Sequence, residues 1–511
     1  MQAPTITFDQ SRLNIADIVA IARQSASVAL SEEAGFRAAI TRGTDFLDRL
    51  LKEDGIIYGV TTGYGDSCTV AVPPELVSEL PQHLFTYHGC GLGSYFTPEQ
   101  TRAIMATRLA SLCKGYSGVS ADLLLQITRL LNHDILPLIP SEGSVGASGD
   151  LTPLSYLAAV LCGERDVLVN EKRISSKDAL QSAGMKALTL RPKEGLAIMN
   201  GTAVMTALAC LAYDRAAYLA QLATKITAMA SVALDGNPQH FDATLFSVKP
   251  HPGMQGVAAW LRQDLACEQV ERNGKRLQDR YSIRCAPHVI GVLADALPFF
   301  RDLIENELNS ANDNPIIDAE GEHVLHGGHF YGGHIAFAMD SMKNTVANIA
   351  DLLDRQMALL VDSRYNHDLP SNLSGAEGSR ATINHGLKAL QISASAWTAE
   401  ALKLTMPASV FSRSTECHNQ DKVSMGTIAA RDCLRVLELT EQVVAAMLIT
   451  VRQGVELRCK LNPATQLQPS LQAMQARLSA DVPAIIEDRA LEPDLRLMME
   501  RIRQQHWVLY G

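Results

Sequence analysis

A run of small residues from Gly143 to Leu154 could carry unusual chemistry. It reads Gly-Ser-Val-Gly-Ala-Ser-Gly-Asp-Leu-Thr-Pro-Leu, so Ala147-Ser148-Gly149 is set among glycines. Glycine reaches backbone conformations closed to other residues, so the segment can fold sharply onto itself. The Gly149 amide nitrogen could then reach the Ala147 carbonyl carbon. Loss of water from that ring and from Ser148 would leave an electrophilic methylene on an imidazolone. The alternative is a plain glycine-rich turn.

A helix is predicted to begin directly after this turn. Asp150 or Thr152 would be its N-cap and Pro153 its first residue, because short polar side chains and proline favour those positions. The free N–H groups and the positive dipole end of that helix would point at the ring.

Further short segments gather polar and aromatic residues. They are Tyr58-Gly59-Val60-Thr61-Thr62-Gly63-Tyr64-Gly65, Asn200-Gly201-Thr202, Gln278-Asp279-Arg280-Tyr281-Ser282-Ile283-Arg284, Asn312-Asp313-Asn314-Pro315, His326-Gly327-Gly328-His329-Phe330 and Ser414 to Asp421. With Ala147-Ser148-Gly149, these motifs resemble those of the aromatic amino acid ammonia-lyases and aminomutases, the family of histidine, phenylalanine and tyrosine ammonia-lyases. The resemblance runs from about Tyr58 to Gly426.

The resemblance implies an enzyme that makes its own cofactor. In that family the tripeptide that corresponds to Ala147-Ser148-Gly149 cyclises autocatalytically to 4-methylidene-imidazole-5-one (MIO), without a metal. The resemblance also implies the fumarase/aspartase-like ammonia-lyase fold, a homotetramer and the non-oxidative removal of ammonia from an aromatic L-amino acid.

Such an elimination needs a base for the barely acidic β-proton and an electrophile for the amine, which is a poor leaving group. A glycine-rich loop follows Tyr58, and a mobile lid of this kind could bring the phenol over a substrate. The alternative is an aromatic side chain packed beside a turn. The resemblance makes Tyr58 the base, whose pKa would have to fall from about 10. It also makes Asn200, otherwise a helix-start residue, a ligand of the ring and the amine.

The segment from Gln278 to Arg284 places three polar side chains at three-residue spacing. Gln278, Tyr281 and Arg284 would share one face of a helical turn. A planar guanidinium suits bidentate capture of a carboxylate, although a solvated amphipathic face is the plain alternative. By resemblance Arg284 binds the substrate carboxylate with help from Asn314, Tyr281 acts at the electrophile, and Gln278 forms part of the pocket wall.

Three histidines, His326, His329 and His334, stand among glycines and suggest a zinc site at first sight. Glu322 is near in sequence but no cysteine is, and the spacing fits no zinc signature, so we predict no metal. The family has His-Gly-Gly-Asn-Phe here, so Phe330 is predicted to pack against the substrate ring. His329 replaces the family asparagine, which leaves the hydrogen bonding beside the ring open.

Specificity is predicted to depend on two places in the chain. The resemblance puts Glu416, Asn419 and Gln420 near the amine and the ring, where an ordinary polar loop is the alternative. Histidine-specific members carry Glu at the position of Gln420. Tyr87 and His88 stand where tyrosine, phenylalanine and histidine enzymes show His-Leu, Phe-Leu and Ser-His, and they match none of the three.

A pocket end made of Tyr87 and His88 is polar and could hydrogen-bond a phenol or an imidazole. Against the bare ring of phenylalanine it would leave each buried polar group unpaired, at about 1–3 kcal/mol. Because Gln420 lacks the carboxylate that would pair with an imidazole, the sequence favours L-tyrosine, converted to trans-p-coumarate, or a ring-hydroxylated relative. Histidine ammonia-lyase and tyrosine 2,3-aminomutase stay open as alternatives.

Composition limits the class of protein. The chain has 511 residues and 47% hydrophobic residues, enough for a large core. With 45 basic and 55 acidic residues and no long basic run, nucleic acid is an unexpected partner. Ten scattered cysteines without a CxxC pair suit free thiols in a reducing cytoplasm. The N-terminus lacks the pattern of a signal peptide, and apolar stretches are interrupted, so we expect a cytoplasmic protein without a membrane span.

Helical periodicity predicts a mainly α chain. Residues 15–22 and 46–51 repeat apolar residues at helical spacing, and Thr97-Pro98-Glu99-Gln100 is a capping box with proline in the first turn. Longer helices are predicted over 202–234, 335–362, 381–406 and 423–452. A strand and turn over 167–171 and a hairpin over 315–325 are the strand signals.

These elements predict a loop-rich N-terminal domain over residues 1–200, with the electrophile and the lid, and a long helical bundle over 201–511. A bundle so rich in alanine would bury more surface against copies of itself, so we expect a homo-oligomer. Two rivals of another class are a non-catalytic helical scaffold and a metal-dependent hydrolase. The scaffold would be expected to have lost Tyr58, Ser148, Asn200 or Arg284, and the hydrolase would need the histidine cluster to bind metal.

Overall fold

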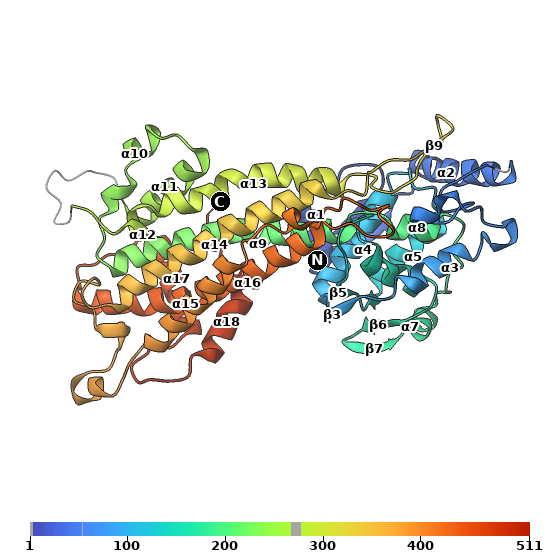
Figure 1. The fold of residues 1–511 in the computed structure, drawn as a ribbon. Helices are drawn as coiled ribbons and strands as arrows, with labels where there is room; N and C mark the ends of the chain where they lie inside the picture. Colours follow the sequence, from blue (N-terminus) through green and yellow to red (C-terminus); the bar gives the residue numbers. More distant parts are fainter. Residues whose placement is uncertain (1–3, 54, 267–276, 511) are drawn as a thin grey trace. The chain divides into compact units, whose positions relative to one another are not determined.

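Helices make up most of the structure, a computed structural model that describes residues 4–53, 55–266 and 277–510 (Figure 1). By contacts the chain divides into two compact units. The first contains residues 1–214, 301–340 and 407–431, and the second contains residues 215–300, 341–406 and 432–511. Four of the five boundaries fall inside long helices, α9 (Ala203–Ala233), α13 (Ala286–Leu308), α14 (Gly333–Val361) and α16 (Gly426–Leu461), and the fifth, between Met406 and Pro407, falls between helices. The division into an N-terminal domain over residues 1–200 and a helical domain over residues 201–511 stays a prediction.

The predicted helices are present. The periodic apolar residues form α1 (Ile15–Ala22) and α2 (Ala34–Lys52), and the capping box begins α4 (Pro98–Leu112). In that box Gln100 N donates to Thr97 Oγ1 at 3.2 Å and Thr97 N donates to Gln100 Oε1 at 2.9 Å. The helix predicted over 381–406 is shorter, α15 (Lys388–Lys403), because residues 378–382 form a 3-10 turn instead.

The first unit combines short helices with small sheets. Its other helices are α3 (Leu80–Tyr87), α5 (Ala121–Asn132), α6 (Leu151–Leu161), α7 (Ser176–Ser182) and α8 (Glu194–Met199). The strands are β1 (Thr5–Phe8), β2 (Ser27–Leu30), β3 (Leu92–Tyr95), β4 (Leu136–Pro137), β5 (Pro140–Glu142), β6 (Asp166–Val169), β7 (Lys172–Ser175), β8 (Ile316–Asp318) and β9 (His323–Leu325). The β1–β2 pair is parallel, and the β3–β5, β4–β6–β7 and β8–β9 pairings are antiparallel. Both predicted strand regions, β6–β7 and β8–β9, are confirmed.

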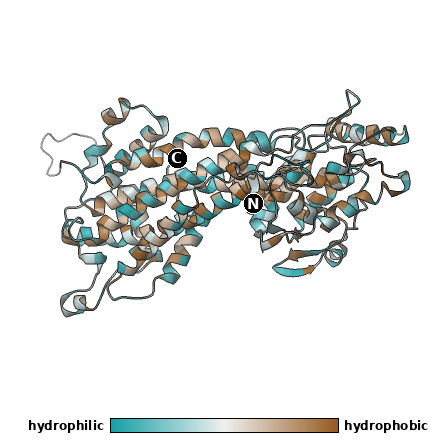
Figure 2. Ribbon diagram, viewed as in Figure 1, coloured by the Kyte–Doolittle hydropathy of each residue, from teal (hydrophilic) through white to brown (hydrophobic). Residues whose placement is uncertain are grey.

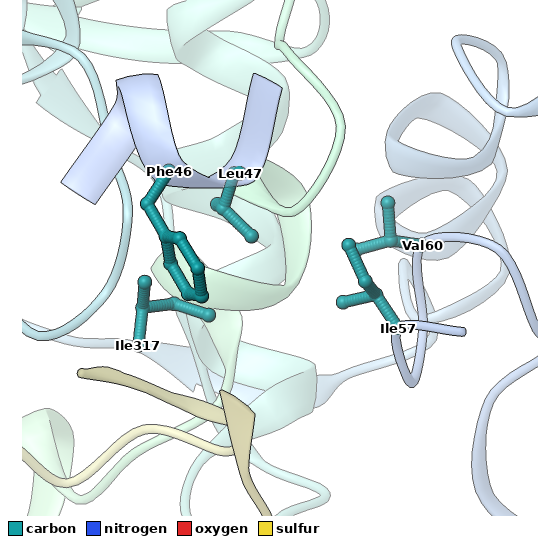
Figure 3. Close-up of a cluster of buried hydrophobic side chains, with 5 residues drawn as sticks. All are labelled: Phe46, Leu47, Ile57, Val60 and Ile317. Carbon is teal, nitrogen blue, oxygen red and sulfur yellow. The ribbon is translucent and has the colours of Figure 1, made fainter. Parts of the chain in front are cut away.

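A compact apolar cluster holds the start of the loop that carries Tyr58. It joins Phe46 and Leu47 of α2 to Ile57, Val60 and Ile317, and each is at most 5% exposed (Figure 3). Ile57 and Val60 flank Tyr58 in sequence, so burial of their side chains fixes the backbone on both sides of the phenol.

The second unit is a bundle of long helices, and Figure 2 shows hydrophobic residues along much of their length. Polar side chains also join these helices: Gln356 Nε2 of α14 donates to Thr227 Oγ1 of α9 at 2.9 Å, and Arg458 Nε of α16 donates to Ala233 O at 2.8 Å. The remaining helices are α10 (Ala243–Ser247), α11 (Pro252–Leu265), α12 (Tyr281–Arg284), α17 (Pro469–Asp481) and α18 (Glu492–Arg503).

Among the described residues, one helical stretch, Tyr281–Leu308, is long and apolar enough to cross a membrane, by length and composition only. This is weak evidence for a membrane, because core helices of soluble proteins can be equally long and apolar.

Candidate active site

A cavity of about 750 Å³ in the first unit collects most of the predicted site residues. Loops and helix ends supply its walls, as is usual for a site positioned by a rigid scaffold. The predicted residues that line it are Tyr58, Tyr87, His88, Ala147, Ser148, Asn200, Asn314, Phe330, Glu416, Asn419 and Gln420. Tyr64, Cys68, Leu196, His326 and Lys422 also line it and were not assigned to the site from sequence.

The Ala147-Ser148-Gly149 turn is crowded by backbone. Gly149 has φ +70°, and a Cβ built on it would lie 2.1 Å from Gly201 O, so only glycine fits there. Gly201 N donates to Ser148 O at 3.3 Å, and Asp150 N donates to Gly201 O at 2.8 Å. These two hydrogen bonds, one on each side of Gly149, hold the turn against the Asn200-Gly201 segment.

The fully buried carboxylate of Asp150 helps to hold this turn in place. It accepts hydrogen bonds from Ser144 Oγ at 3.0 Å, from the Val204 and Met205 amides at 3.0 Å each, and from Thr427 Oγ1. Burial raises the pKa of Asp150, and the four hydrogen bonds oppose that shift by favouring the ionised form.

Asp150 is the N-cap residue of α6 by position, as predicted, but its side chain does not cap that helix. It satisfies the free amides at the start of α9 instead. The prediction that Thr152 could be the N-cap is wrong. Pro153 is the third residue of α6 and not the first, because the helix begins at Leu151.

The Ser148 hydroxyl faces the cavity and meets Gln420. Gln420 Nε2 donates to Ser148 Oγ at 3.3 Å, and Gln420 Oε1 accepts from Thr415 Oγ1 at 2.8 Å. Thr415 therefore orients the Gln420 amide, so that its N–H group points at the serine.

Asn200 is buried beside the turn and has one unused acceptor. Its Nδ2 donates to Asn314 O at 2.9 Å, while its Oδ1 has no hydrogen-bond partner among the described residues. Since a buried polar atom without a partner costs about 1–3 kcal/mol, this oxygen points to a donor that a ligand would bring. Asn314 Oδ1 accepts from Gly327 N at 2.9 Å.

Arg108 in α4 was missed by the sequence analysis. Its fully buried guanidinium donates to Asn200 O at 3.0 Å, to Asn312 Oδ1 at 2.7 Å and to Ala197 O. Burial lowers the pKa of Arg108 to about 10, which leaves it a cation at neutral pH. An arginine inside the apolar run of a helix was the available signal, because such a cation is rarely buried without partners.

Tyr58 is half-buried, and its hydroxyl oxygen accepts a hydrogen bond from Gly65 N at 2.7 Å. Burial raises the pKa of this phenol above 10, the Gly65 amide opposes the shift, and the nearby Glu416 carboxylate adds to it. The His326 ring meets the Tyr58 ring edge-on, with 6.2 Å between the ring centroids.

The far end of the cavity is aromatic and polar. The Tyr87 and His88 rings meet edge-on at 4.5 Å, and His88 Nε2 is buried without a partner among the described residues. Burial and the Arg165 cation lower the pKa of His88 to about 4, so this imidazole is neutral at physiological pH. Ser155 Oγ donates to His88 O at 3.2 Å, and Arg165 donates to Phe85 O, so main-chain carbonyls fix this end of α3.

Within residues 4–53, 55–266 and 277–510, no group of three His, Cys, Asp or Glu side chains is arranged to hold a metal. His329 lies beside Gly327, since a Cβ built on that glycine would be 3.2 Å from His329 Nδ1. Phe330 lines the cavity as predicted.

Gln278, Tyr281 and Arg284 belong to the second unit and line another cavity there, of about 770 Å³. Arg284 Nη2 donates to Gln278 Oε1 at 3.3 Å, and the guanidinium lies 4.6 Å from the Tyr281 ring centroid. The predicted grouping of these three side chains is therefore present, although only Tyr281 and Arg284 lie in the helix α12.

Replacing Arg108 by methionine should destabilise the protein. Asn200 O, Ala197 O and Asn312 Oδ1 would lose a buried donor, and we expect about 3 kcal/mol less free energy of unfolding. Arg129→Met, on the exposed face of α5, is the matched control. Denaturant unfolding of both variants decides the point, and equal midpoints would contradict the role given to Arg108.

Comparison with known proteins identifies the family of the whole chain. A family model described as aromatic amino acid lyase matches residues 13–480. A histidine ammonia-lyase of Gloeobacter violaceus is 36% identical over 504 residues, 98% of this chain and 96% of that protein. The crystal structure of histidine ammonia-lyase from Trypanosoma cruzi is similar with a TM-score of 0.89, at 30% identity, over 98% of this chain and 94% of that chain. Tyrosine aminomutase from Streptomyces globisporus gives 0.91 at 32% identity, over 98% and 97%. The chain belongs to the aromatic amino acid lyase family.

Proposed function

We propose that this chain is a carbon–nitrogen lyase that removes ammonia from an aromatic L-amino acid without oxidation. One observation carries the proposal: the Ser148 hydroxyl of an Ala-Ser-Gly turn faces the same cavity as the Tyr58 phenol and the unpartnered Asn200 Oδ1. A proposed electrophile source, a proposed base and a hydrogen-bond acceptor for an amine thus line one cavity.

The turn suits the formation of MIO from Ala147-Ser148-Gly149. Glycine at position 149 and the contacts of Gly201 compress the backbone, and Asp150 holds the turn in place. When formed, the group supplies an electrophile that makes the substrate amine a better leaving group. Asn200, whose Oδ1 has no hydrogen-bond partner among the described residues, would hold it, and Gln420 lies next to the serine hydroxyl that would leave as water. We propose no metal in this chemistry.

Tyr58 is the proposed base. Its oxygen already accepts the Gly65 N–H, and this bond would stabilise the phenolate that takes the β-proton. A solution base is needed to remove the phenol proton beforehand, because burial holds the pKa of Tyr58 above its ordinary value.

The substrate carboxylate needs a cation. We propose that Arg284 supplies it, with Tyr281 and Gln278 beside it and Asn314 as a further hydrogen-bonding group. Since Arg284 lies in a cavity of the second unit, we also propose a homotetramer in which copies of the chain complete each other's sites. Phe330, Asn419 and Glu416 are proposed to contact the substrate.

The choice of amino acid differs from the one the sequence favoured. Two of the three relatives named above are histidine ammonia-lyases, so L-histidine, converted to urocanate, is the first candidate and L-tyrosine the second. Neutral His88, with an unused ring nitrogen, can pair with either an imidazole or a phenol. L-Tyrosine stays a candidate because Gln420 has a neutral side chain and offers no charge to an imidazole.

An aminomutase is a second candidate reaction, because the similar structures include a tyrosine aminomutase. Such an enzyme uses the same groups and returns the amine to the β-carbon. The proposed location is the cytoplasm, in keeping with nine free cysteines in the described part of the chain.

A product assay across L-histidine, L-tyrosine, L-phenylalanine and L-dihydroxyphenylalanine tests the substrate. We expect a conjugated acid from histidine or tyrosine and the least from phenylalanine, whose bare ring leaves His88 Nε2 unpaired. Chromatography for a β-amino acid separates lyase from aminomutase. No product from any of the four substrates would contradict the proposed function.

Ser148→Ala should abolish MIO formation. The intact wild-type chain should be lighter than its sequence mass by two waters, one from cyclisation and one from dehydration of Ser148, whereas the variant, whose alanine has no hydroxyl to lose, should lack the second loss. Activity should fall to background in the variant and be insensitive to chelators in the wild type. A wild-type chain with full sequence mass and full activity would contradict the proposal.

Tyr58→Phe should lower kcat by about 10²–10⁴-fold, the usual contribution of a general base. The wild-type rate should rise with pH from neutral into the alkaline range, because the raised pKa of Tyr58 means that more phenolate forms as pH increases. In the variant this alkaline rise should be missing, and its persistence would show that another group is the base.

A further inference from the structure

The loop that carries Tyr58 is fixed at its root and exposed at its tip. The root is buried through Ile57 and Val60 (Figure 3). The tip forms a 3-10 turn over Gly65–Thr69 in which no residue is buried. Since few apolar contacts hold the tip, its position depends on the polar contacts that it makes.

One side chain from outside the loop ties down this tip. Both carboxylate oxygens of Glu416 accept from Asp66 N, at 2.9 Å and 3.1 Å. In the described parts of the chain, no other side chain from outside the loop hydrogen-bonds Gly63 to Val70. The amide next to Asp66, that of Gly65, is the one that donates to the Tyr58 oxygen.

Glycine at position 65 makes this contact possible. Gly65 has φ +57°, and a Cβ built on it would lie 2.4 Å from both oxygens of Glu416. Any larger residue would push the carboxylate away from the Asp66 amide, so the residue type at 65 serves the contact with Glu416.

Glu416 comes from a short turn that also reaches the electrophile. Glu416, Cys417 and His418 have φ values of +51°, +54° and +66°, which bring Thr415 and Gln420 together as a two-residue antiparallel bridge. Such left-handed residues cost energy and persist where surrounding contacts require them. Gln420, at the other end of the turn, donates to Ser148 Oγ in the uncyclised tripeptide.

We infer that Glu416 is a positioning residue whose carboxylate latches the tip of the Tyr58 loop to the turn that carries Gln420. The turn from Thr415 to Gln420 thereby sets the placement of the base relative to Ser148. This inference deepens the proposed function, since Tyr58 acts as a base only under that proposal. The latch itself exists in the substrate-free protein and can be measured there.

Hydrogen exchange of the full-length, substrate-free protein tests the latch directly. In Glu416→Ala the peptide that covers residues 63–70 should exchange about tenfold faster, because a charge-assisted bond to the Asp66 amide is lost. Glu416→Gln keeps an acceptor and should restore most of the protection. Gly65→Ala keeps the glutamate at position 416 but crowds its carboxylate oxygens, so this peptide should exchange as fast as it does in Glu416→Ala. Glu75→Ala, an exposed acid of the neighbouring turn, is the control and should exchange like the wild type.

Kinetics separate a latch from a substrate contact. For a latch, kcat should fall in Glu416→Ala and in Gly65→Ala together with the lost protection, and Glu416→Gln should recover both. Unchanged exchange in Glu416→Ala, whatever happens to KM, would overturn the inference and leave Glu416 as a substrate contact. If the wild type shows no lyase activity, the proposed function fails, while the exchange experiment still decides the latch.

Discussion

The buried carboxylate of Asp150 is the constraint on which the site depends. A carboxyl group inside a protein is costly unless its oxygens are hydrogen-bonded, and here hydroxyls and amides from three parts of the chain bond to them. The Ser148 turn, the start of α9 and the start of α16 are thereby joined at one carboxyl group. A shift of any of them would leave this buried group partly unsatisfied, so the turn has one well-defined shape.

Rigidity is unevenly distributed around the cavity. The Ser148 turn is enclosed by backbone and braced through Arg108, whereas the Tyr58 loop is anchored only at its root and latched at its tip. This division suits an elimination. The Ser148 turn must be held in shape for the proposed cyclisation, while Tyr58, as the proposed base, must let a substrate in and then close over it.

Local patterns predicted the helices and strands well, because each signal was contained in a few residues. The Thr97 capping box and the hairpin around Ile317 are examples. The resemblance to the family's motifs predicted most of the named residues that line the cavity of the first unit. Hydrogen-bond partners that depend on the tertiary fold could not be predicted from the sequence. Asp150 caps α9 and not its own helix, and Arg108 reaches the Asn200 segment from a distant helix. The substrate inferred from Tyr87, His88 and Gln420 also differed from the one named for the two histidine ammonia-lyases, because the fold, and not the residue type alone, decides which polar atoms face a substrate.

The end of α3 is held by the carbonyl groups of Phe85 and His88, and not by the side chains that face the cavity. Every amino acid has such a carbonyl, so residues 87 and 88 can be exchanged without disturbing the bonds that place them. Ring recognition can thus diverge in evolution, or be redesigned, independently of the machinery that builds the electrophile. With residues 87 and 88 as the proposed ring contacts, one scaffold could take different aromatic amino acids through changes in two neighbouring codons.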